Sequence, residues 1–233
     1  ASGRSLKIKN KRIEYQHYID RNRMTKNYKS LIILILFALQ VVSSWAQKPF
    51  VFHNKKFRIA QFTDLHWDAK SPKCDSTRTT ILNILQREKP DIAILTGDVV
   101  TEKPYEKGWK QIIEIFETAR TPFVVTMGNH DAEHFSRDEI YRMLFASKFY
   151  SGLPSPKEIS GNGNCALPIY DNNTANAKPK AVLYCIDSND YQPDKDLGEY
   201  DWIHFDQIEW YRRTSEAFTL QNNKRPLPSL MFF

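Results

Sequence analysis

The strongest constraint on the fold lies in residues 122–131, where a short apolar run ends abruptly in polar side chains. Residues 122–127 are apolar and partly β-branched, which is typical of a buried strand. Gly128-Asn129-His130-Asp131 follows, and the glycine allows a sharp turn or a close approach to a ligand. Open α/β sheets place ligands at the carboxyl ends of their strands. Taken alone, however, Gly-Asn is also an ordinary turn pair.

Two earlier stretches have the same design. The strand-like residues 57–63 lead into Asp64 and His66, and the strand-like residues 91–96 lead into Gly97 and Asp98. In an extended backbone, residues two apart point to the same face, so Asp64 and His66 are placed to bind one ion. A helix-capping Asp beside a surface His is the alternative interpretation of that pair alone.

Two predicted helices alternate with these strands. Residues 77–89 and 105–120 carry apolar side chains at helical spacing. A strand–helix–strand–helix–strand order predicts an α/β fold with parallel strands and right-handed crossovers. This arrangement aligns Asp64, Asp98 and Asn129 along one edge of the sheet.

The remaining segments predict further elements. Helices are expected at 137–149 and 204–219, and strands at 50–52, 165–170, 181–187 and 229–233. The strands at 165–170 and 181–187 form a hairpin around the polar turn 171–180. In a tight hairpin whose paired numbers sum to 350, Cys165 lies opposite Cys185, at a Cα separation compatible with a disulfide.

With its blocks Asp64-x-His66, Gly97-Asp98 and Gly128 to Asp131, the chain resembles the calcineurin-like metallophosphoesterases from about residue 57 onward. The resemblance implies a sandwich of β-sheets flanked by helices and a site for two divalent or trivalent metal ions. Asp64 and His66 would bind one ion, Asn129 would bind the other, and Asp98 would bridge them. Fe, Mn and Zn all suit such carboxylate, imidazole and amide ligands.

The resemblance also assigns the catalytic side chains. His130 would lie beside the substrate phosphate, as an electrophile or as the acid for the leaving group, and Asp131 would orient it by hydrogen bonding. The alternative for His130 is a further metal ligand. His66 stands where purple acid phosphatases carry glycine, and Thr101 where they carry tyrosine. The chain therefore resembles the purple-acid-phosphatase-like proteins of the Asp-x-His type, without a purple chromophore.

One family feature does not appear in the sequence. The family continues with a single His after a further strand and then with Gly-His-x-His, whereas only His134 and His204 follow His130 here. We therefore expect the chain to be the N-terminal part of a longer enzyme, incomplete at its C-terminus and inactive by itself.

The first 46 residues form a leader of different composition. We interpret residues 1–23 as disordered or non-native, and residues 24–46 as a signal peptide with basic, apolar and small-x-small segments. A transmembrane anchor is the alternative, but the apolar run is shorter than the roughly 20 residues a span needs. We expect residues 47–233 to be an exported phosphoesterase domain, periplasmic or extracellular, with no stable membrane span after cleavage.

Charge argues against nucleic acid as a partner. The leader holds nine Lys/Arg and two Asp/Glu, which leaves 24 basic and 25 acidic residues in 47–233. The expected partner is a small phosphorylated substrate, and the pattern sets no oligomeric state. The function implied is hydrolysis of a phosphate monoester by a metal-activated hydroxide. A phosphodiesterase and a non-catalytic exported binding module are the alternatives.

Overall fold

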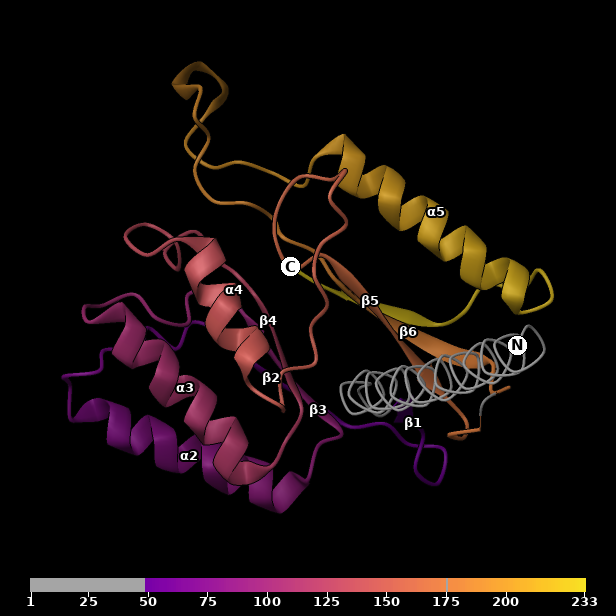
Figure 1. The fold of residues 1–233 in the computed structure, drawn as a ribbon, viewed down its shortest axis with the longest axis horizontal. Helices are drawn as coiled ribbons and strands as arrows, with labels where there is room; N and C mark the ends of the chain where they lie inside the picture. Colours follow the sequence, from indigo (N-terminus) through magenta and orange to yellow (C-terminus); the bar gives the residue numbers. More distant parts are fainter. Residues whose placement is uncertain (1–48, 175) are drawn as a thin grey trace, which may run out of the picture. The chain divides into compact units, whose positions relative to one another are not determined.

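The computed structural model describes residues 49–174 and 176–233 (Figure 1). The disordered leader and signal peptide predicted for residues 1–23 and 24–46 lie outside this part. The strands are β1 (Phe50–Val51), β2 (Ile59–Phe62), β3 (Ile92–Thr96), β4 (Phe123–Thr126), β5 (Cys165–Tyr170), β6 (Pro179–Cys185) and β7 (Ser229–Phe232). The helices are α2 (Lys73–Glu88), α3 (Tyr105–Ala119), α4 (Arg137–Ala146), the 3-10 helix η1 (Lys195–Leu197) and α5 (Phe205–Gln221).

The first sheet contains β2, β3 and β4 in that order, and all neighbours are parallel. Helices α2 and α3 connect these strands in sequence, because a parallel pair needs a crossover connection. The predicted alternation is therefore confirmed. Its consequence for the site is that the carboxyl ends of the three strands lie at one edge.

The second sheet has the order β1-β5-β6-β7. Strands β5 and β6 form the predicted antiparallel hairpin, with Cys165 paired to Cys185 and a register shift between Ile169 and Tyr170. Strand β1 pairs with β5 in parallel, so the two predicted N-terminal strands separate into different sheets. A short bridge between His53 and Lys56 forms the turn between them.

Two hydrophobic cores hold the layers together, and β3 contributes to both. Its alternate residues Ala93 and Leu95 pack in the core that includes α2, α3 and α4. Ile92 and Ile94 pack between the two sheets, against residues such as Leu167. Because side chains alternate across a strand, a strand buried on both faces is apolar throughout. This double burial explains the unbroken apolar run at 92–95.

Helix α5 covers the outer face of the second sheet. Tyr184 of β6 makes edge-to-face ring contacts with Trp210 and Tyr211 of α5, at centroid distances of 6.4 and 4.8 Å. Figure 1 shows α5 over β5 and β6, and α2, α3 and α4 on the opposite side of the sheets. The layers therefore follow the order helices, sheet, sheet and helix, which confirms the predicted sandwich.

Two helix ends differ from the expectation by three or more residues. Helix α2 begins at Lys73 rather than Thr77, directly after Pro72. Proline fixes φ near the helical value and needs no N–H partner, so it suits a helix start. Helix α4 ends at Ala146 rather than Phe149, because Ser147 adopts an extended conformation.

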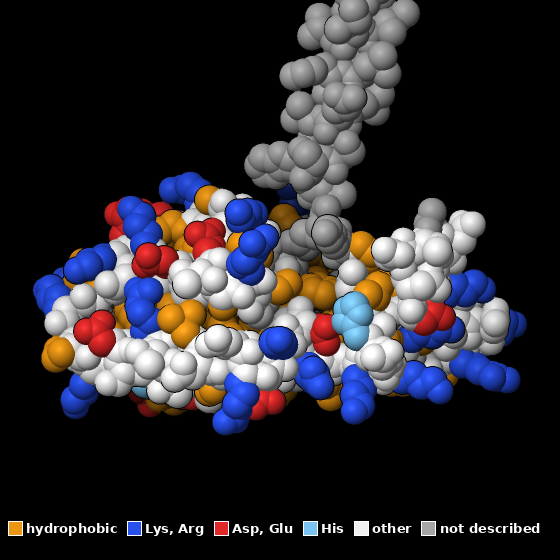
Figure 2. Space-filling model, turned by 90° about the horizontal axis from the view of Figure 1, so that it is seen from below, with side chains coloured by type: hydrophobic (Ala, Val, Ile, Leu, Met, Phe, Trp, Pro, Cys, Tyr) orange, Lys and Arg blue, Asp and Glu red, His pale blue; other side chains and the backbone are white. Residues whose placement is uncertain are grey.

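The surface of the described residues carries both signs of charge. In Figure 2, Lys and Arg side chains are spread over the face among Asp, Glu and hydrophobic side chains. Within residues 49–174 and 176–233, no helix has the length and apolar character needed to cross a bilayer.

Candidate active site

The predicted polar blocks meet at the carboxyl edge of the first sheet. Asp64 follows β2, Asp98 follows β3 and Asn129 follows β4. Backbone hydrogen bonds continue past the strands, since Asp64 N–H donates to Gly97 O at 3.1 Å and His66 N–H donates to Asp98 O at 2.9 Å. These bonds hold the loops after β2 and β3 in register, so their side chains converge.

Asp64, His66 and Asp98 form a cluster that fits a metal ion. Each offers a ligand atom, and the three atoms all lie within 4.8 Å of one another. His66 Nε2 lies 3.8 Å from Asp64 Oδ1 and 3.9 Å from Asp98 Oδ2. The side chains of Asp64 and His66 are 61% and 51% exposed, whereas Asp98 is only 14% exposed. The cluster therefore has a solvent-facing side, with Asp98 at its base.

The backbone reaches this geometry in an unexpected way. Asp64, His66 and Asp98 all have positive φ, at 52°, 41° and 52°. The extended conformation expected from Asp64 to His66 is therefore wrong, although the two side chains do meet. A left-handed conformation costs a non-glycine residue about 1–2 kcal/mol. Strain of this kind gathers at functional sites, where the surrounding structure maintains it.

Two glycines allow the strand ends to approach closely. A Cβ added to Gly128 would lie 2.3 Å from Asp98 Oδ1 and 2.7 Å from Asp98 N, so the carboxylate occupies the space that a side chain would fill. Gly97 has φ of +81°, and a Cβ there would lie 3.0 Å from Gly128 Cα. His130 N–H donates to Asp98 Oδ1 at 3.2 Å. Asp98 is thus fixed between the loops, as a bridging ligand would need to be.

His130 is accessible and has a carboxylate partner. Its side chain is 41% exposed, and Nδ1 lies 2.8 Å from Glu133 Oε1. The hydrogen bond with Glu133 raises the pKa of His130. The ring centroid lies 6.2 Å from that of His66. His130 therefore lies beside the Asp64–His66–Asp98 cluster with one ring nitrogen already engaged.

Asp131 has a different partner set from the one expected. Its side chain is buried, with 1% exposure, and accepts from the N–H groups of Val99 at 2.8 Å, Val100 at 3.0 Å and Gly128 at 2.9 Å. Burial raises the pKa of this carboxyl to about 6, and the three N–H groups oppose that shift. The expected hydrogen bond to His130 is therefore wrong. The turn directs Asp131 into the protein, where it ties the loop after β3 to the loop after β4.

Comparison with known proteins agrees with this geometry. The family model for calcineurin-like phosphoesterases matches residues 57–227. The chain belongs to this family. The matched residues include the strand ends that carry Asp64, Asp98 and His130. A phosphoesterase of this family is a metal-dependent enzyme, in agreement with the Asp-His-Asp cluster.

Individual relatives and a solved structure also resemble this chain. "Probable inactive purple acid phosphatase 29" of Arabidopsis thaliana is 29% identical over 75% of this chain and 51% of its own length. "Phosphatase DCR2" of Saccharomyces cerevisiae is 26% identical over 70% of the chain and 32% of its own length. The chain thus spans from a third to half of the length of these relatives. A crystal structure titled as a dimetal phosphatase from Danio rerio has the same fold, with a TM-score of 0.51, 12% identity, and coverage of 76% of this chain and 68% of that one.

Two residues beside the candidate site were not predicted from the sequence. Glu133 contacts His130, and Tyr191 donates its hydroxyl to Glu133 Oε1 at 2.6 Å. The His-x-x-Glu spacing was the only local signal for Glu133. Tyr191 lies 61 positions after His130, in a loop that no motif marks. The two histidines that follow His130, His134 and His204, contact Tyr105 and Asp201 respectively.

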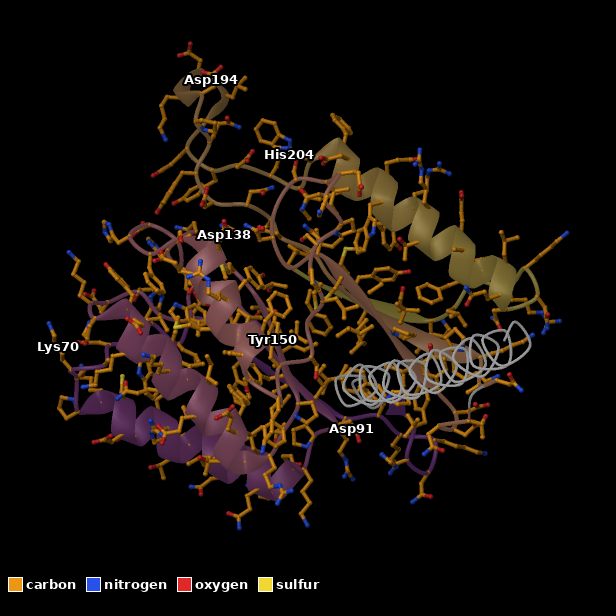
Figure 3. All side chains as sticks on the ribbon, in the orientation of Figure 1. Lys70, Asp91, Asp138, Tyr150, Asp194 and His204 are labelled. Atoms are coloured by element: carbon orange, nitrogen blue, oxygen red, sulfur yellow. The ribbon has the colours of Figure 1, made fainter. Side chains whose placement is uncertain are left out.

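The loop that carries Tyr191 connects β6 to α5. Arg137 holds its beginning through ion pairs with Asp187 and Asp190. The Tyr191 ring stacks on Tyr200 at a centroid distance of 5.8 Å, and the two residues also form a backbone bridge. In Figure 3, Asp194 marks the far end of this loop and His204 marks its return to α5. These contacts set the position from which Tyr191 reaches His130.

Proposed function

We propose that the protein hydrolyses phosphate monoesters in a metal-dependent reaction outside the cytoplasm. The observation that carries this proposal is the convergence of Asp64, His66 and Asp98 within 4.8 Å, beside the accessible imidazole of His130. Family membership supports the reaction class. Monoester specificity and export are steps beyond the family.

The donor set fits two hard or borderline metal ions. Asp64 and His66 would hold one ion, Asn129 would hold the other, and Asp98 would contribute to both. Fe, Mn and Zn are the candidates. When bound, such ions neutralise phosphoryl oxygens and lower the pKa of a bound water to roughly 7.

The chain itself supplies acid catalysis and positioning. His130 is placed to donate a proton to the departing alkoxide oxygen, which turns the imidazolium into the neutral ring and releases an alcohol. Glu133 holds Nδ1 of that ring, so Nε2 is the nitrogen available to the substrate. Asp131 contributes by keeping the two loops together rather than by contacting His130.

Metal content and turnover together test the reaction. We expect the purified full-length gene product to bind two equivalents of Mn²⁺ or Zn²⁺, measured by elemental analysis after dialysis, and to hydrolyse 4-nitrophenyl phosphate faster than bis(4-nitrophenyl) phosphate. Asp64→Ala should abolish both properties. Asp68→Ala is the matched control, since Asp68 lies in the same loop outside the cluster. Faster hydrolysis of the diester would favour a phosphodiesterase instead.

A non-catalytic binding module is the second candidate. Two relatives from Arabidopsis thaliana, "Probable inactive purple acid phosphatase 29" and "Probable inactive purple acid phosphatase 14", are named as inactive. Under this alternative the protein would bind metal ions and inorganic phosphate but turn over neither ester. Product formation above that of Asp64→Ala would rule it out.

Export has a separate test. Expressed from its own gene, the protein should be recovered outside the cytoplasm with Gln47 as its first residue, as measured by N-terminal mass spectrometry. An intact segment 24–46 in the mature protein would contradict cleavage.

A further inference from the structure

A chain of three hydrogen bonds connects Asn129 to His130 through two residues that no motif marks. Asn129 Nδ2 lies 3.0 Å from the Tyr191 hydroxyl, which lies 2.6 Å from Glu133 Oε1. His130 Nδ1 lies 2.8 Å from the same Glu133 oxygen. The direct distance from the Tyr191 hydroxyl to His130 Nδ1 is longer, at 3.5 Å.

The chemistry of the groups assigns every proton in this chain. An amide nitrogen only donates, so the Tyr191 oxygen accepts from Asn129. The single hydroxyl proton then goes to the Glu133 carboxylate, which only accepts when ionised. The remaining partner, Nδ1 of His130, must therefore carry a proton and donate it to Glu133. The three hydrogen bonds are mutually consistent only with this assignment of donors and acceptors.

Two functional orientations follow from the same network. Because Nδ2 of Asn129 points to Tyr191, the amide oxygen is the atom left to bind a metal ion. Because Nδ1 of His130 is engaged, Nε2 is the atom left for the substrate. We propose that Glu133 and Tyr191 are positioning residues that orient the metal ligand Asn129 and the catalytic His130 together. The proposal rests on the proposed function.

The two positioning residues come from different loops of the fold. Glu133 lies in the loop between β4 and α4, close to His130 in sequence. Tyr191 comes from the loop between β6 and α5, which Arg137 anchors through Asp187. The network therefore links the carboxyl edge of the first sheet to the loop between β6 of the second sheet and α5.

The histidine tautomer gives a direct test without metal or substrate. In the metal-free protein, above the pKa of the ring, ¹⁵N NMR should show His130 protonated at Nδ1, with its signal assigned by loss in His130→Ala. Glu133→Leu should shift the ring to the Nε2-protonated form that free imidazoles favour, since the acceptor for Nδ1–H is gone. Tyr191→Phe should keep the Nδ1-protonated form, because Glu133 remains.

Metal affinity tests the other arm of the network. Tyr191→Phe should weaken Mn²⁺ or Zn²⁺ binding at the Asn129 site by about 10–100-fold, the usual effect of removing a group that orients a ligand. Tyr200→Phe is the matched control, because it removes a hydroxyl from the stacked ring of the same loop. We expect Tyr200→Phe to bind metal like the wild type.

Kinetic measurements can separate a role of Glu133 in positioning His130 from a general loss of folded structure. Glu133→Leu should lower kcat for an alkyl phosphate by about 10–100-fold, and less for 4-nitrophenyl phosphate, whose leaving group needs little protonation. KM should change little for either substrate. Equal losses on both substrates would oppose a role for Glu133 in proton donation by His130.

The outcomes distinguish this inference from the proposed function. Absence of turnover in the full-length wild-type protein would contradict the proposed function, and the tautomer of His130 would still test the positioning roles of Glu133 and Tyr191. An Nε2-protonated His130 in the wild type, or equal metal affinity in Tyr191→Phe and Tyr200→Phe, would overturn the inference.

Discussion

Replacing Asp131 with alanine should destabilise the protein strongly, although this side chain touches no candidate ligand or substrate group. The carboxylate accepts from three backbone N–H groups, and the residues Val99 and Val100 are fully buried. An unsatisfied buried donor costs about 1–3 kcal/mol. Three N–H groups would lose their acceptor, but water entering the space left by the side chain would satisfy part of them. We therefore expect the free energy of unfolding to fall by about 3–5 kcal/mol.

Asparagine at the same position should have a smaller effect. Oδ1 of Asp131 serves Val99 and Val100, while Oδ2 serves Gly128. The amide oxygen of Asp131→Asn can retain the first pair, and its NH₂ group would then face the N–H of Gly128. One hydrogen bond is lost, so we expect a loss of about 1–3 kcal/mol.

Urea unfolding in the presence of EDTA measures these differences, because chelation removes the stabilisation that bound metal would add. Asp138→Asn is the control, since Asp138 is an exposed carboxylate in the first turn of α4. Its loss should stay below about 1 kcal/mol. A loss below about 1 kcal/mol for Asp131→Ala would refute the reasoning, as would equal losses for the alanine and asparagine variants.

Three further predictions concern the metal site, the acid and the thiols. Asp98→Asn should keep the fold but lose one or both metal ions; stoichiometric metal in this variant would contradict the bridging role. His130→Ala should lower turnover by about 10²–10⁴-fold with metal content intact, whereas loss of metal would make it a ligand. Cys165 and Cys185, free in the structure but paired across the hairpin, should form a disulfide in the exported protein. Thiol titration of the denatured, unreduced protein should then find one thiol, that of Cys74, and finding three would exclude the bond.

The parts of the fold that depend on local patterns were predictable from the sequence. Each strand of the first sheet is a short apolar run that ends in a polar block, and helices alternate with the strands. Parallel pairing then places Asp64, Asp98 and Asn129 at one edge without further information. The Cys165–Cys185 register followed equally well, because hairpin geometry relates its two strands directly.

The partners of individual side chains were not predictable, because they depend on backbone angles and distant loops. Residue spacing suggested that Asp131 contacts His130, but the turn after Gly128 directs Asp131 inward and leaves that contact to Glu133. The positive φ angles that bring Asp64 and His66 together could not be read from the sequence, because Asp and His adopt them only in a minority of positions. Tyr191 reaches His130 only through a loop held by side chains from other elements.

The left-handed backbone of Asp64, His66 and Asp98 affects how such a site can be lost in evolution. Glycine adopts this conformation without the penalty of about 1–2 kcal/mol, although it also loses more chain entropy on folding. At the exposed positions Asp64 and His66, a ligand-to-glycine substitution would therefore remove a metal ligand at little net change in stability. Selection for a folded protein alone would not oppose such changes. A duplicated gene released from selection for turnover is thus expected to lose these side chains early while the sandwich persists.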